Sequence, residues 1–177
     1  MHDQEDLYFV TATISVWEKI FLEENYAKII IDSLLWLRRN HNIMLFAFVL
    51  MPSHLHMIIK PIHLTIAQVL QQFGSFTAHQ IIQLLKQEKR NEILDKFHIH
   101  RRDNQRNYSV WQDIQAKNIF SDKFLNQKLE YIHNNPINKE WNLINDRADY
   151  KYSSAGFYDK EIRPIIPIDD LREWLVS

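Results

Sequence analysis

Two strand-length apolar runs, residues 43–51 and 54–61, follow each other with only Pro52 and Ser53 between them. Each run has the length of a buried strand, and a Pro-Ser dipeptide is typical of a turn. A connection of two residues joins neighbouring strands only when they run antiparallel. We therefore predict a tight antiparallel hairpin, and the fold of this chain must place that hairpin inside a sheet.

The segments on both sides of the hairpin carry strand and helix signals in a defined order. Aromatic and β-branched types indicate strands, and apolar residues at helical spacing indicate amphipathic helices. We predict strands at 7–17, 43–51, 54–61 and 107–113 and helices at 23–40, 66–87 and 121–135. The order β-α-β-β-α-β-α predicts an α+β protein with a ferredoxin-like βαββαβ antiparallel sheet, helices on one face and one added helix.

The composition predicts one compact domain. The chain has 177 residues, of which 46% are hydrophobic and 24% charged, and only two are glycine. We expect a single domain over 1–177, with a core at about 7–136 and a C-terminal extension at about 137–177 that wraps the surface. No apolar stretch reaches the roughly 20 residues that span a bilayer, and "MHDQEDLYFV" is acidic where a signal peptide is basic. We expect a cytoplasmic protein that does not enter a membrane.

His54 and His56 interrupt the apolar run at 54–61. Alternate residues of a strand share a face, so both imidazoles point to one side, with backbones about 7 Å apart. Unpaired imidazoles are unfavourable in an apolar strand, which favours a shared ligand such as a metal ion. The spacing alone is weak evidence, because nine histidines make an accidental pair common. The chain has a second pair, His98 and His100, for which a solvated strand or loop beside basic residues is the better interpretation.

A metal site on these histidines needs a further ligand. The chain has no cysteine, which excludes thiolate sites, and two ligands are too few for a hard divalent ion. In the helix predicted at 121–135, Gln127, Tyr131 and Asn135 form a polar row opposite an apolar stripe. If that row faces the histidines, it brings a phenol and an amide to them. The alternative for Tyr131 is an ordinary residue at the margin of an amphipathic helix.

Two motifs in this order resemble a known family. "MPSHLHMIIKP" at 51–61 and "KLEYIHNNPINKEW" at 128–141 are similar to motifs of the single-tyrosine HUH transposases, and more narrowly of the REP-associated tyrosine transposases of bacteria. Further similar segments, "YFVTATISVW", "VWQ" and "DYKYSSAGFY", extend the resemblance over most of the chain. Ser53 stands where the family usually has Asn, which leaves both histidines in place. The family has the ferredoxin-like core that the pattern predicts.

The resemblance implies roles for individual residues. It makes His54, His56 and Asn135 ligands of a divalent metal, Mg²⁺ or Mn²⁺, and Tyr131 the catalytic nucleophile, with both histidines part of the catalytic centre. The implied activity is that of a metal-dependent single-stranded DNA endonuclease and strand transferase, a transposase acting through a 5′-phosphotyrosine on hairpin-forming repeats. A phenol with a pKa near 10 needs help at neutral pH, which the ion would supply. Such a protein would associate with the bacterial nucleoid when it binds DNA.

The charge pattern offers candidate DNA contacts. The formal net charge is −1, but seven Lys or Arg stand against four Asp or Glu between Lys86 and Arg106. We expect phosphate contacts from four basic residues and base stacking on Tyr108 or Trp111. The four basic candidates are Lys60, Arg101, Arg102 and Arg106. The competing interpretation is a solvated charged loop, with Trp111 in the core.

Three other functions are compatible with parts of this pattern. A non-catalytic single-stranded nucleic-acid-binding protein derived from a transposase could share the fold, but such sheets carry aromatic pairs where this chain has His54 and His56. A hydrolase of the His-x-His-x-Asp type needs an acid where this chain has Ile58. A transposase relic could keep these residues without activity. The sequence also leaves open whether one chain completes the active site or a homodimer exchanges the tyrosine helix.

Overall fold

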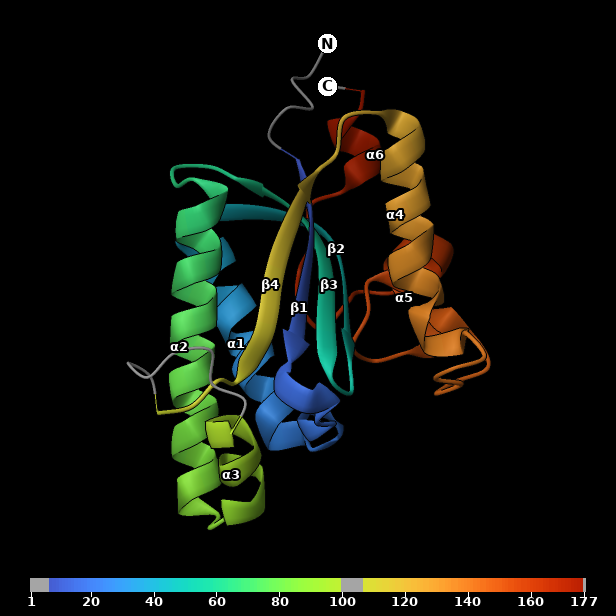
Figure 1. The fold of residues 1–177 in the computed structure, drawn as a ribbon. Coiled ribbons are helices and arrows are strands. Elements are labelled where there is room, and N and C mark those ends of the chain that lie inside the picture. The colour runs from blue at the N-terminus through green and yellow to red at the C-terminus, as the bar shows by residue number, and fades with distance from the viewer. Residues whose placement is uncertain (1–6, 100–106, 177) are drawn as a thin grey trace.

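The structure, a computed structural model, describes residues 7–99 and 107–176. Its centre is a four-stranded antiparallel sheet in the order β2-β3-β1-β4 (Figure 1). The strands are β1 Tyr8–Ile14, β2 Ile43–Met51, β3 His54–Pro61 and β4 Trp111–Asn118. The helices are α1 Glu24–Arg39, α2 Ile66–Gln87, α3 Asn91–Ile99, α4 Asp122–Asn134, α5 Ala155–Lys160 and α6 Leu171–Trp174. The predicted ferredoxin-like βαββαβ arrangement with an added helix is confirmed.

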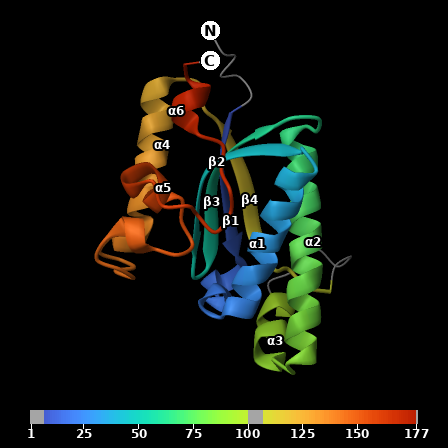
Figure 2. The same ribbon diagram turned by 180° about the vertical axis from the view of Figure 1, so that it is seen from behind.

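The sheet has a helical layer on each face. The crossover helices α1 and α2 cover one face, and α4 lies on the opposite face together with α5 and α6 (Figures 1 and 2). Each face has its own hydrophobic core. Leu55, Met57 and Ile59 pack with α1 and α2, whereas Ile58 packs with Leu125 and Ile132 of α4. Along the described chain, no helix is long and apolar enough to cross a bilayer.

The predicted hairpin has the predicted bounds, and its register fixes where the histidines lie. Met51 pairs with His54 across the β2–β3 turn. On the other side of β3, Thr13 pairs with His54 and Thr11 with His56 on β1. β3 is therefore an inner strand, and His54 and His56 share the face of Ile58. That face is covered by α4.

The C-terminal extension lies along the outer edge of β2. Leu50 N–H donates to Tyr152 O over 2.8 Å, and Ser154 N–H donates to Phe48 O over 3.0 Å. Farther along, Leu45 N–H donates to Asp169 Oδ2 over 2.8 Å. These bonds satisfy backbone groups that a free edge strand would expose. The extension, expected only to wrap the surface, therefore completes the sheet edge.

Two segments differ from the sequence prediction. The last strand begins at Trp111 instead of residue 107 and continues to Asn118, through the polar sequence "QDIQAKN". β4 is an edge strand in which every residue is exposed or only partly buried, so it lacks the apolar signal of β2 and β3. Residues 91–99 form α3, which we did not predict. Its short apolar set, Ile93, Leu94 and Phe97, is buried, and that burial stabilises a helix too short to be recognised by periodicity.

Candidate active site

Tyr131 of α4 lies beside the two histidines of β3. The ring centroids of His54 and His56 are 4.8 Å apart, and those of His56 and Tyr131 are 5.1 Å apart. Both histidines are only 5% exposed, whereas Tyr131 is 48% exposed. Ile132, the next residue, is buried in the core between α4 and the sheet, and this fixes the rotation of the helix. A buried imidazole pair thus adjoins a phenol that solvent and a large substrate can reach.

Asn135 completes the predicted set. It follows the last residue of α4, where Pro136 redirects the chain into the 3-10 turn Asn135–Ile137. Its side chain is buried, and Nδ2 donates to Tyr131 O over 3.2 Å. The Asn135 side chain is also close enough to His54 to influence the pKa of that imidazole. The structure therefore brings together all four residues that the sequence analysis singled out, although they come from two distant segments.

Burial keeps both imidazoles neutral. It lowers the pKa of His54 to about 4, and the Asn135 side chain opposes that shift. The pKa of His56 is lowered to about 3, first by burial and then by the positive charges of His54 and Lys128. At neutral pH each ring therefore has an unprotonated nitrogen. A lone pair on that nitrogen is the form of histidine that binds a metal ion.

The hydrogen bonds of the two rings favour coordination through Nε2. His56 Nδ1 lies 3.0 Å from Thr11 Oγ1, and His54 Nδ1 lies 3.4 Å from Ser53 Oγ. When Nδ1 carries the proton it donates to these hydroxyls, and the lone pair is on Nε2. Within the described ranges no group of three or more His, Asp or Glu side chains could hold a metal. A metal here would depend on Asn135 as the third protein ligand.

Aromatic side chains enclose the histidines. Phe9 stacks on His56 with ring centroids 5.5 Å apart, and Trp17 and Trp141 lie 5.9 and 5.5 Å from the ring of His54. Val16 and Trp17 both have φ of 54°, in the left-handed region that non-glycine residues rarely adopt. This turn places Trp17, which is largely exposed, against His54. Sequence analysis missed both tryptophans, and only their presence inside the similar segments "YFVTATISVW" and "KLEYIHNNPINKEW" could have indicated them.

Lys128 was also missed, although it stands one turn before Tyr131. Its Nζ lies 4.6 Å from the ring centroid of Phe9 and 5.3 Å from that of Tyr131. Burial lowers the pKa of Lys128, and Lys117 of β4 adds to this shift. Gln127, the predicted member of the polar row, is exposed instead. At this end of α4, the residue on the face towards the histidines is therefore Lys128 instead of the predicted Gln127.

Two contacts anchor the end of α4 that carries Tyr131. His133 is buried, and its Nε2 lies 2.9 Å from Ser154 Oγ in the C-terminal extension. The guanidinium of Arg147 donates to Glu130 Oε2 over 2.7 Å and to Asp159 Oδ2 over 2.7 Å. It also donates to Asn134 Oδ1 over 3.0 Å. The extension thus holds the tyrosine helix as well as the sheet edge.

Of the four basic residues predicted to contact DNA, the structure describes only Lys60. Lys60 lies farther along β3, with its Nζ 5.8 Å from the ring centroid of Trp174. Arg101, Arg102 and Arg106 lie outside the described residues. Trp111 packs in the core against Phe73 and donates from Nε1 to Thr77 Oγ1 over 2.9 Å, as the competing interpretation held.

Of the second histidine pair, only His98 lies in the described part of the chain. His98 lies near the end of α3 and is hydrogen bonded through Nδ1 to Asn107 O over 2.8 Å. His98 is exposed, as predicted, but it lies in a helix and not in the predicted strand or loop. His100 lies outside the described residues.

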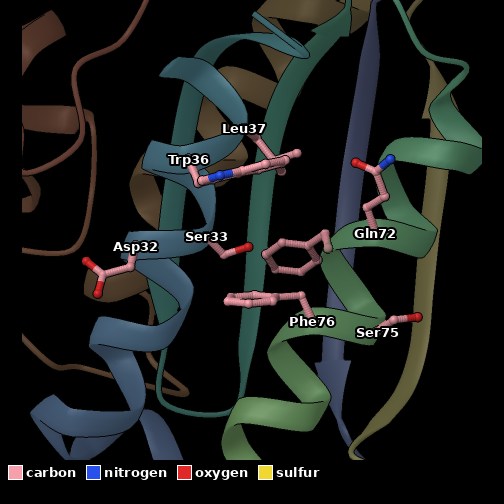
Figure 3. Close-up of a pocket in the computed structure, with 8 residues that line it drawn as sticks. Asp32, Ser33, Trp36, Leu37, Gln72, Ser75 and Phe76 are labelled. Carbon is pink, nitrogen blue, oxygen red and sulfur yellow. The ribbon is translucent and has the colours of Figure 1, made fainter. Parts of the chain in front are cut away.

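A large apolar hollow of about 640 Å³ lies between α1 and α2, away from the histidines (Figure 3). Helices α1 and α2 lie on the opposite face of the sheet from α4, the helix that carries Tyr131 (Figure 1). The lining of the hollow includes one charged residue, Asp32, which pairs with Lys28 over 2.6 Å. The lining residues are Asp32, Ser33, Trp36, Leu37, Gln72, Phe73, Ser75 and Phe76. This hollow is separate from the candidate active site.

The fold and site define an α+β protein in which a ferredoxin-like sheet and an added helix bring two histidines to a tyrosine. Among solved structures, this fold is shared with "REP associates tyrosine transposase bound to a REP hairpin", with a TM-score of 0.63. That match covers 97% of this chain and 90% of the other at 15% identity. A crystal structure of a protein assigned as a transposase from Deinococcus radiodurans R1 gives a TM-score of 0.47 and 15% identity, covering 72% and 88%. Neither a protein-family model nor a curated protein sequence matches this chain.

Proposed function

We propose that this chain is a metal-dependent single-stranded DNA endonuclease and strand transferase that uses Tyr131 as its nucleophile. The observation that carries the proposal is the convergence of Tyr131 on the His54–His56 pair, with ring centroids 5.1 and 4.8 Å apart. A half-exposed phenol beside two buried neutral imidazoles combines a nucleophile with metal-binding groups. The shared fold with a REP-associated tyrosine transposase supports the same assignment.

The chemical step is a transesterification. Tyr131 Oη attacks the phosphorus of a DNA phosphodiester, and its proton leaves to solvent. The new Oη–P bond forms as the P–O3′ bond breaks, and the departing 3′ oxygen takes up a proton. The product is a 5′-phosphotyrosine and a free 3′-hydroxyl. The covalent bond retains the energy of the broken phosphodiester, so a 3′-hydroxyl can reverse the step on another strand without ATP.

The donor set fits a divalent cation. His54, His56 and Asn135 would hold it through two imidazole nitrogens and an amide oxygen, and all three side chains are buried and neutral at pH 7. Such an ion, when bound, would supply positive charge that stabilises the negative charge of the transition state. With nitrogen and oxygen donors and no thiolate, Mg²⁺ or Mn²⁺ is the expected ion. Thr11 and Ser53 would orient the rings.

The exposure of Tyr131 and the shared fold support the substrate class that we propose. Tyr131 is half exposed at the surface, as a nucleophile that acts on a polymer must be. The transposase with the shared fold is bound to a REP hairpin, and we propose hairpin-forming single-stranded repeats as the substrate here. Tyr131 and both histidines of one chain already meet, which favours a site completed without exchange of α4 between subunits.

The experiment is a covalent-adduct assay. The protein is mixed with end-labelled single-stranded hairpin DNA taken from repeats beside its gene, with Mn²⁺ or Mg²⁺, and resolved by denaturing electrophoresis. We expect an SDS-resistant protein–DNA band that EDTA abolishes. Tyr131→Phe is the matched control, because it removes only the nucleophilic oxygen and keeps the ring contacts with Phe9 and His56.

Two outcomes would contradict the proposal. A band that persists in Tyr131→Phe would place the nucleophile elsewhere. Absence of any adduct with DNA that the wild type binds tightly would favour a non-catalytic single-stranded DNA-binding protein.

A further inference from the structure

Two lysines lie at opposite ends of the row of rings that forms the site. At one end, the ammonium of Lys128 lies over Tyr131 and Phe9, at 5.3 and 4.6 Å from the ring centroids. At the other end, the ammonium of Lys19 lies 5.4 Å from the ring centroid of Trp141. Trp141 in turn lies 5.5 Å from the ring of His54. Contacts therefore run from Lys128 through Tyr131, the two histidines and Trp141 to Lys19.

These lysines come from different parts of the fold. Lys128 is on α4, and Lys19 lies in the connection between β1 and α1. In Figure 1 that connection and the loop that follows α4 are both at the lower end of the sheet. The row therefore crosses the histidine-bearing face from the tyrosine helix towards that lower end.

Neither lysine forms an ion pair with a carboxylate in residues 7–99 or 107–176. Several other lysines do, such as Lys28 with Asp32 and Lys151 with Glu24. An ammonium held against aromatic ring faces gains cation–π attraction but loses part of its hydration. A bound anion would compensate for the lost hydration. Lys117, which influences the pKa of Lys128, places a second positive charge near one end. Among the described residues, the site thus has cations without a carboxylate partner on both sides of the nucleophile and histidines.

We propose that the DNA single strand crosses the site along this row, with Lys128 and Lys19 binding phosphates on opposite sides of the phosphate that Tyr131 attacks. A single strand carries one negative charge per nucleotide, so it can meet both cations while the intervening phosphate reaches Tyr131. The exposed ring of Trp17 beside His54 offers a base a surface for stacking. This inference rests on the proposed function and adds the path and the phosphate contacts of the substrate.

The test measures binding separately from cleavage. All variants carry Tyr131→Phe, and their affinity for a labelled hairpin with a single-stranded tail is measured by fluorescence anisotropy from 50 to 400 mM NaCl. Lys128→Met and Lys19→Met remove the charge and keep most of the aliphatic stem. Lys28→Met is the matched control, because Lys28 lies on α1 and is already paired with Asp32.

We expect each of the two site variants to bind more weakly and to reduce the slope of log K against log salt by about 0.7, the value for one single-strand phosphate contact. The double variant should lose both contributions, and Lys128→Arg should restore the wild-type slope. An oligonucleotide shortened on one side of the cleavage position should abolish the effect of one lysine only. These results support a strand that crosses the site.

Unchanged slopes in both site variants, with adduct formation intact in proteins that retain Tyr131, would overturn this path and leave the proposed function standing. Loss of both lysine effects with the same shortened oligonucleotide would overturn the placement on opposite sides. A wild-type protein that neither binds nor cleaves single-stranded DNA would overturn the proposed function and this inference with it.

Discussion

The ring of Tyr131 stands at 70° to the ring of His56, with 5.1 Å between their centroids. One residue is on a helix added behind the sheet and the other is on an inner strand, so their proximity is a property of the tertiary fold. Ile132 sets the rotation of α4, and His133 and Arg147 tie its end to the C-terminal extension. The geometry of the site therefore depends on contacts outside it.

Thr11→Val should weaken metal binding without displacing a ligand. The variant keeps the shape of the side chain but removes the hydroxyl 3.0 Å from His56 Nδ1. Loss of a hydrogen bond that orients a ligand typically reduces metal affinity about 10- to 100-fold, and calorimetric titration with Mn²⁺ would measure it. Thr13→Val is the control, since Thr13 pairs with His54 across the strands but has no side-chain hydrogen bond to it in the described structure. Equal losses in both variants would contradict the orienting role.

Arg147→Met should reduce the rate of adduct formation more than it weakens DNA binding. The guanidinium joins Glu130 and Asn134 of α4 to Asp159, so its loss frees the end of the helix that carries Tyr131. Because Glu130 is largely exposed, we expect the free energy of unfolding in urea to fall by only about 1 kcal/mol. Arg172→Met, which breaks surface pairs with Asp170 and Glu161, should leave the rate unchanged. Equal rates of adduct formation in Arg147→Met and Arg172→Met would contradict the role of Arg147 in holding the end of α4.

Acid should destabilise the metal-free protein at pH values well above those at which carboxyl groups ordinarily titrate. The folded-state pKa values of His54 and His133 are lowered to about 4 and that of His56 to about 3, in each case mainly by burial. Below pH 6.5 these three histidines become protonated in the unfolded chain but stay neutral in the folded chain, so unfolding takes up protons. Their contribution to stability is therefore complete above pH 6.5 and is lost as pH falls towards 4.

Urea unfolding of EDTA-treated protein between pH 7.5 and 4.5 would measure this effect. The free energy of unfolding should decline by up to about 1.4 kcal/mol per pH unit for each histidine. His133→Gln should show a shallower decline because one group is removed. A flat profile between pH 6.5 and 5 would contradict neutral burial of these rings.

Metal removal should separate binding from chemistry. Because Lys128 and Lys19 are independent of the proposed ligands, EDTA should abolish adduct formation and leave most of the affinity for hairpin DNA. Added Mn²⁺ or Mg²⁺ should restore the adduct in wild type but not in His56→Ala. Adduct formation at full rate in EDTA would exclude a metal-dependent step.

Local patterns predicted the elements with strong signals. The β2–β3 hairpin was predicted with its bounds because both strands are nearly continuous apolar runs, and α4 was predicted within a residue or two because Ser121 caps it and Pro136 follows it. The bounds of β4 were predicted too early in the sequence because an exposed edge strand has little apolar signal. α3 was missed because its three buried residues are too few to show a helical periodicity in the sequence.

Sequence motifs singled out His54, His56, Tyr131 and Asn135 together, and the packing of α4 on the sheet places these residues side by side. Their roles stay a prediction. Lys19 and Trp17 were missed because their roles arise from a turn with left-handed backbone at Val16 and Trp17, which no local pattern indicates. Trp141 reaches His54 only through the loop after α4. Such contacts depend on tertiary folding and carry no periodic signal in the sequence.

The most direct test of the central claim is to identify the amino acid that becomes linked to DNA. After reaction with hairpin DNA and Mn²⁺, the adduct is digested with nuclease and trypsin and analysed by mass spectrometry. Trypsin should release residues 129–139, in which Tyr131 is the single tyrosine. We predict that this peptide carries a 5′-linked nucleotide on Tyr131. A nucleotide on any other residue, or an unmodified 129–139 peptide from purified adduct, would contradict the account.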